Sequence, residues 1–88
     1  MNNEKSIKLA YLRTKLGELE AELMGLQADY NIMASEAELL RANSSGDKNA
    51  GQRIERLNEV IDSIKKKMLD IMSLIASMRH QLAEAGKE

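Results

Sequence analysis

The feature that most constrains this chain is a series of apolar residues spaced alternately three and four positions apart. In the first half the series runs without interruption through Leu9, Leu12, Leu16, Leu19, Leu23, Leu26, Tyr30, Met33, Ala37 and Leu40. In the second half it returns as Ile54, Leu57, Ile61, Ile64, Met68, Ile71, Ile75, Met78, Leu82 and Ala85. A mean spacing of 3.5 residues is the heptad repeat of a coiled-coil helix, whose a and d positions face a partner helix. The pattern therefore predicts two long helices with one apolar seam each.

Composition agrees with an all-α fold and argues against several other classes. The 88 residues include no Pro, Phe, Trp or Cys, and 31% of them are charged, a mixture that favours long helices over sheets. Without cysteine there is neither a disulfide framework nor a thiolate metal site, which is compatible with the cytoplasm. The most apolar window, residues 68–78, is too short to span a bilayer and contains Asp70. We expect a cytoplasmic chain without a membrane span.

The segment RANSSGDKNAG, residues 41–51, separates the two apolar series. Asn43 and Gly46 tolerate the left-handed backbone that ends a helix, and Asp47 or Asn49 suits the N-cap of the next one. A phosphate-binding loop would need a GxxxxGK[ST] pattern after a strand, which this segment lacks, whereas a flexible linker is a stronger alternative. We predict a single domain over residues 1–88, with helices over 3–42 and 49–85 and a turn over 43–48.

The two seams match each other when the chain folds back on itself. If residues whose numbers sum to 94 face one another, every a position on one helix meets a d position on the other, so that Leu12 meets Leu82. In this register Asp29 and Lys67 are both at g positions and are expected to approach. The match favours an antiparallel two-helix coiled-coil hairpin over a flexible linker.

Both predicted helices also carry apolar or small residues outside their seams. On the first helix these are Ala10, Thr14, Gly17, Ala21, Met24 and Ala28, and on the second they are Val60, Leu69, Met72 and Leu74. A glycine inside a helix costs about 1 kcal/mol relative to alanine, so Gly17 suggests the close approach of another helix. We identify these ten positions as candidate partner-binding residues. They predict either a homodimer of hairpins forming a four-helix bundle or a hairpin completed by a different helical protein.

The polar residues offer no constellation for catalysis or metal binding. His80 is the only histidine, and it falls at an outward f position between Arg79 and Gln81, which supply neither a nucleophile nor a carboxylate. A di-iron bundle would need Glu-x-x-His pairs pointing into the core, and no such pair occurs. We therefore expect a protein that is not an enzyme and that uses no cofactor and no metal.

Two functions from different classes are compatible with this pattern. The surplus apolar surface favours a non-enzymatic adaptor or small chaperone that binds the amphipathic helix of a partner. The alternative is a small helical-bundle regulator that binds nucleic acid, RNA in particular, through Lys65, Lys66 and Lys67. A net charge of −1 disfavours nucleic-acid binding, and lysine at e and g positions commonly flanks a helix seam. Protein binding is the leading hypothesis.

Overall fold

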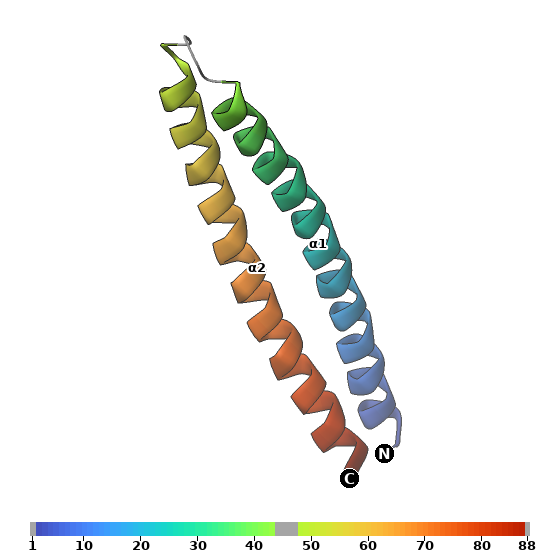
Figure 1. The fold of residues 1–88 in the computed structure, drawn as a ribbon. Helices are drawn as coiled ribbons and strands as arrows, with labels where there is room; N and C mark the ends of the chain where they lie inside the picture. The colour runs from blue at the N-terminus through green and yellow to red at the C-terminus, as the bar shows by residue number, and fades with distance from the viewer. Residues whose placement is uncertain (1, 44–47, 88) are drawn as a thin grey trace.

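Two long antiparallel α-helices make up the structure. The computed structural model describes residues 2–43 and 48–87, in which α1 spans Asn2–Ala42 and α2 spans Ala50–Lys87. The helices lie side by side, and both ends of the chain are at the same end of the molecule (Figure 1). The described residues contain no strand. The prediction of an all-α antiparallel hairpin is confirmed: α1 ends at Ala42 as predicted, and the other three helix ends differ from the predicted ones by one or two residues.

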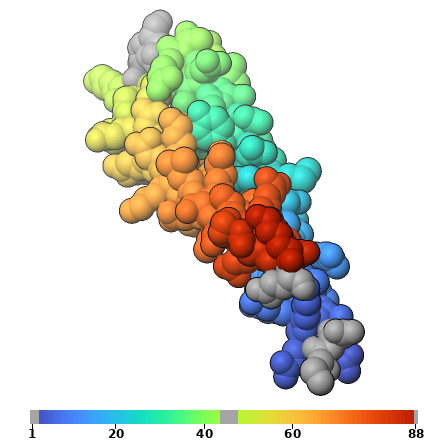
Figure 2. Space-filling model, turned by 90° about the horizontal axis from the view of Figure 1, so that it is seen from below, coloured from blue at the N-terminus to red at the C-terminus, as the bar shows by residue number. Residues whose placement is uncertain are grey.

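The hairpin is a rod rather than a compact domain. It measures 70 × 14 × 14 Å and has a radius of gyration of 19.7 Å, whereas a compact chain of this length has a radius of about 12 Å. Side chains of the two helices meet along the rod in the view from the end that carries the termini (Figure 2). The accessible surface is 6767 Å², compared with about 5,200 Å² for a compact monomer of this mass. The hairpin alone therefore leaves much of its surface in water.

The backbone at the helix ends explains where each helix stops. The N–H of Asn43 donates to the carbonyl of Leu39 at 3.0 Å, so the α-helical pattern persists through the last turn of α1. The N–H of Arg53 donates to the carbonyl of Asn49 at 3.1 Å, which is the first helical bond of α2 and places Asn49 at the N-cap. Asn49 is thus one of the two N-cap candidates from the sequence, while Gly46 and Asp47 lie outside the described residues.

Burial confirms the predicted seam. Every seam residue of both helices is buried or half-buried, and the most enclosed large side chains are Leu12, at 3% exposed, and Ile75, at 5%. The seam continues to Ala50, which is 2% exposed and lies seven residues before Leu57. No polar or charged residue of the described chain is buried. The two seams are therefore the whole apolar core of the hairpin.

Contacts across the helices agree with the predicted register. In the predicted register the numbers of facing a and d residues sum to 94. The e residues of the two helices then meet in pairs whose numbers sum to 99 or 92. Arg79 forms an ion pair with Glu20 at 3.1 Å, and Arg41 donates to Asn58 at 3.3 Å. All four residues are at e positions, and each pair sums to 99. The hairpin therefore has the a-to-d pairing that the sequence predicts.

One expected contact across the hairpin does not form. Among the described residues, no ion pair joins Asp29 to Lys67, although both are at g positions. Both side chains are exposed, and a solvated pair gains too little energy to hold two mobile side chains in one geometry. The g positions therefore do not contribute the electrostatic support that was expected there.

A matched pair of isoleucines tests the seam. Ile71 is 7% exposed and Ile32 is 55% exposed. We expect Ile71→Ala to lower the free energy of unfolding by about 2 kcal/mol, because a cavity is left between the helices. Ile32→Ala should leave it unchanged or raise it slightly, since alanine is the better helix former. The measurement is urea unfolding followed by circular dichroism at equal protein concentration, and equal losses for the two variants would show that the seam is wrongly placed.

Candidate interaction surface

The hairpin has two long sides that differ in composition. We call the side formed by the e and b positions of both helices the e face, and the side formed by the g and c positions the g face. The contacts Arg79–Glu20 and Arg41–Asn58 lie on the e face, because all four residues are at e positions. These two faces and the outer f positions hold the exposed side chains of the hairpin.

Large apolar side chains are exposed on both helices. On α1 they are Ile7, Tyr11, Met24, Ile32 and Leu39, and on α2 they are Val60, Leu69, Met72 and Leu74. Those of α1 occupy b, c and f positions around its outer surface, whereas α2 concentrates its apolar residues toward α1. Four of these residues were not among the candidates from the sequence: Ile7, Tyr11, Ile32 and Leu39. Their c and f positions in the heptad already placed them away from the seam. A helix that is apolar on several sides is typically covered by more than one neighbour.

The structure divides the ten candidate partner-binding residues among three surfaces. All ten are exposed. The e face holds Ala10, Gly17, Met24, Leu69 and Met72; the outer f positions of α1 hold Thr14, Ala21 and Ala28; and the g face holds Val60 and Leu74. Leu74 follows Met72 by two residues and is therefore turned from it by roughly 200° around the helix. A single flat partner cannot cover both of these residues, so the candidates do not form one surface.

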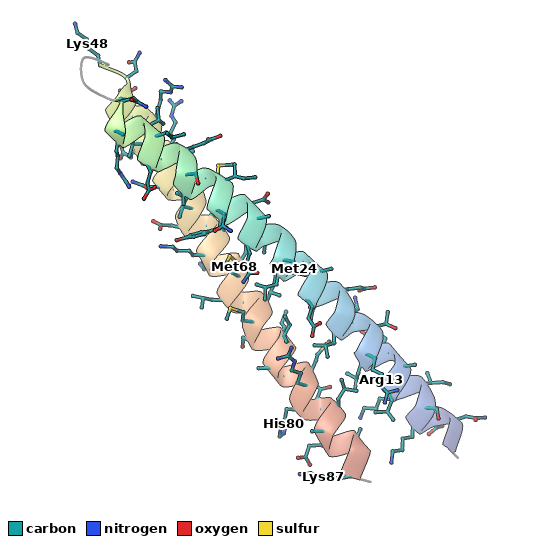
Figure 3. The ribbon with its side chains drawn as sticks, turned by 45° about the vertical axis from the view of Figure 1, so that its right-hand side comes forward. Arg13, Met24, Lys48, Met68, His80 and Lys87 are labelled. Carbon is teal, nitrogen blue, oxygen red and sulfur yellow. The ribbon has the colours of Figure 1, made fainter. Side chains whose placement is uncertain are left out.

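The e face brings two of these candidates together around a groove. Met24 and Met72 border a hollow of about 420 Å³, and they are 70% and 49% exposed. The other residues that line it are Glu20, Leu23, Ile75, Ala76 and Arg79. Leu23 is half-buried and Ile75 is buried, so the seam itself forms the apolar floor. Met24 lies about halfway along α1, close to the part of α2 that carries Met68 (Figure 3).

A salt bridge stands beside this groove. The guanidinium of Arg79 donates to a carboxylate oxygen of Glu20 at 3.1 Å, and both side chains are largely exposed. Such a surface pair contributes only about 0.2–1 kcal/mol to stability. It places a negative and a positive charge next to Met24 and Met72. The predicted register brings these two e positions together, although the pair was not among the contacts expected from the sequence.

Gly17 has no role inside the hairpin. A Cβ added at Gly17 would meet no atom within 4 Å, and the same is true at Gly25. The packing of α1 against α2 therefore does not require glycine at either position. Close approach by another molecule, which the sequence suggested for Gly17, stays a prediction.

The three consecutive lysines point in different directions. Lys65, Lys66 and Lys67 are all exposed, and successive residues of a helix are turned by about 100°. The ammonium group of Lys65 lies 5.7 Å from the centre of the Tyr30 ring, a cation–π contact that holds it on the e face. Asp62 and Asp70 lie about one turn to either side. The lysines therefore do not form one continuous basic strip.

The end of the rod that carries the termini has a polar hollow. It has a volume of about 380 Å³ and is lined by Glu4, Lys5, Lys8, His80, Gln81, Glu84 and Ala85. His80 is exposed, as its f position predicts. Within residues 2–43 and 48–87, no three histidine or acidic side chains are grouped so that they could hold a metal ion. Neither described helix is long and apolar enough to cross a membrane.

Comparisons with known proteins identify no relative of this chain. No protein-family model matches it, and neither a curated protein nor a solved structure matches it.

The two internal glycines of α1 test whether the hairpin itself, without a partner, needs glycine at these positions. We expect Gly17→Ala and Gly25→Ala each to raise the free energy of unfolding by roughly 0.5–1 kcal/mol, because alanine loses less backbone entropy on folding and finds open space at both positions. Urea unfolding at low protein concentration measures both effects. A loss of stability in either variant would show that the glycine is needed within the hairpin itself.

Proposed function

We propose that this protein is a non-enzymatic protein-interaction module, an adaptor or small chaperone of the cytoplasm, that binds amphipathic helices on its e face. The observation that carries the proposal is the cluster of Met24, Met72 and Leu69, which are 70%, 49% and 65% exposed. Seam side chains continue this surface into the groove between the helices. A partner helix placed there would complete a bundle, since three or more helices enclose a core that two leave open.

The energetics of the two-helix rod support this proposal. Full burial of a leucine or methionine side chain contributes about 1.5–3 kcal/mol, and three such side chains are largely in water on one face. Most α1 seam residues are only half-buried against α2. A bound helix would therefore bury both the exposed cluster and the open edge of the seam. Methionines on such a surface can adapt to more than one partner shape.

Two pairs of lysine substitutions test which face binds. We expect Met24→Lys with Met72→Lys to abolish capture of a helical partner, because two charges would have to be buried. Val60→Lys with Leu74→Lys adds the same charge on the g face and serves as the matched control. The measurement is affinity purification from the source cell with the wild type and both variants, with helicity checked by circular dichroism. A partner that the e-face variant retains and the control loses would move the binding site to the g face.

The nucleic-acid alternative makes a different prediction. If Lys65, Lys66 and Lys67 bind RNA, affinity should fall steeply with salt, and replacing all three by alanine should remove it. The three lysines point in different directions and lie between Asp62 and Asp70, so they give no continuous contact for a phosphate backbone. We therefore expect no salt-sensitive binding of a structured RNA at physiological ionic strength. Fluorescence anisotropy across a salt series measures this, and tight binding that the triple variant loses would favour the alternative.

A further inference from the structure

We infer that the helix pair covering the e face is that of a second copy of this chain, antiparallel to the first and related to it by a two-fold axis at the level of Met24. This inference rests on the proposed function and names its partner. It follows from how apolar and charged residues are placed along the e face.

The apolar cluster is centred so that it can meet itself. In the register of the hairpin, residues of α1 and α2 lie side by side when their numbers sum to 94. Met72 is therefore level with residue 22 of α1, and Leu69 with residue 25. Met24 lies between them. A two-fold axis at this level places Met24 against the same residue of the partner copy and Met72 against the partner's Leu69. Each large apolar side chain of the cluster then has an apolar neighbour, as an isologous interface requires.

The charges on the e face become complementary in the same arrangement. Lys65 is level with residue 29 of α1, and the axis brings it to within about one residue of the level of the partner's Glu20. Arg79 is level with residue 15, and the axis brings it beside the partner's Asp62. Glu20 and Arg79 already pair within one chain at 3.1 Å. The two copies would thus build two identical four-residue charge networks, one on each side of the methionines.

Other arrangements of two copies place like charges together. If the second copy lay parallel to the first, Arg13 would face the partner's Arg79, and Glu38 would face the partner's Glu55. If the antiparallel copy slid by one helical turn toward the termini, Lys65 would face the partner's Arg79. Like charges across an interface are unfavourable and select against such arrangements. Charge therefore disfavours both the parallel copy and the antiparallel copy displaced toward the termini.

The size of the interface is sufficient for a stable dimer. The axis lies near the middle of both helices, so the two 70 Å rods overlap over almost their full length. A face 70 Å long and 14 Å wide covers about 1,000 Å², and a standard interface buries about 800 Å² per partner. The outcome is a four-helix bundle in which α1 lies against α1 and α2 against α2.

Cysteine cross-linking tests the position of the axis. The wild type has no cysteine, so a single introduced thiol reports on one site only. Met24→Cys should give a covalent dimer with a short bis-maleimide, because the two thiols meet at the axis. Leu74 is exposed to a similar degree, 51%, but lies on the g face, so Leu74→Cys should give no covalent dimer under the same conditions. Cross-linking of Leu74→Cys alone would overturn the inference.

Two charge reversals test the direction of the second copy. Asp62→Arg would face the partner's Arg79 and should weaken the dimer at least tenfold in sedimentation equilibrium. Asp70→Arg makes the same change of charge on the same helix but on the g face, and it should leave the dimer unchanged. Both acids are exposed, so neither change should affect helicity. Equal affinity for the two variants would overturn the antiparallel arrangement.

The mass of the wild-type chain separates this inference from the proposed function. A dimer at micromolar concentration in light scattering is expected. A monomer at tens of micromolar would overturn the inference that the partner is a second copy. The proposed function would still be supported if the protein captured a different helical protein and Met24→Lys with Met72→Lys abolished that capture. A dimer that survives that double substitution would overturn the inference, because it would be assembled through another face.

Discussion

The contact between the two heptad seams is the interaction on which the rest of this structure depends. The described chain has only two helices, so no sheet or third helix fixes their relative position. The alternation of three and four residues sets the face that each helix presents, and the pairing of a with d positions sets the register. Leu12 and Ile75 are well enclosed, but many seam residues of α1 are only half-buried. A core of this thickness gives the hairpin its geometry and leaves little stability in reserve, as expected for a chain below the usual domain size.

The helices contribute unequally to this contact. The apolar residues of α2 are concentrated on the side that faces α1, with Ile61, Ile64, Ile71 and Ile75 all buried. Those of α1 extend around its circumference, from the seam to Met24 on one flank and Ile32 on the other. One neighbouring helix therefore satisfies much more of α2 than of α1. This inequality leaves much of the circumference of α1 in water, and it supports the proposal that a further helix covers the e face.

Much of this architecture could be predicted from the sequence, because helical periodicity fixes the angle of every side chain about its axis. The seam and the register followed from that angle, and the capping residues around the turn placed the helix ends there within one residue. The ion pairs did not: Asp29 and Lys67 had suitable positions and stayed apart, whereas Glu20 and Arg79 joined. Exposed charges gain too little from pairing for spacing alone to decide which of them meet. The division of Met72 and Leu74 between opposite faces was implicit in their heptad positions, yet the sequence alone did not show that Met72 adjoins a groove.

Apolar surface and charge have separate consequences for recognition on the e face. Burial of Met24, Met72 and Leu69 would supply affinity to almost any amphipathic helix, because the hydrophobic effect has no direction. The charges nearby are directional: Tyr30 holds Lys65 over its ring at 5.7 Å, and Glu20 holds Arg79 at 3.1 Å. Charges of opposite sign on the two sides of an apolar centre favour a partner with the inverse pattern over one with the same pattern. An antiparallel copy of the chain would have that inverse pattern, so in the dimer proposed above charge would select the partner that the apolar contact holds.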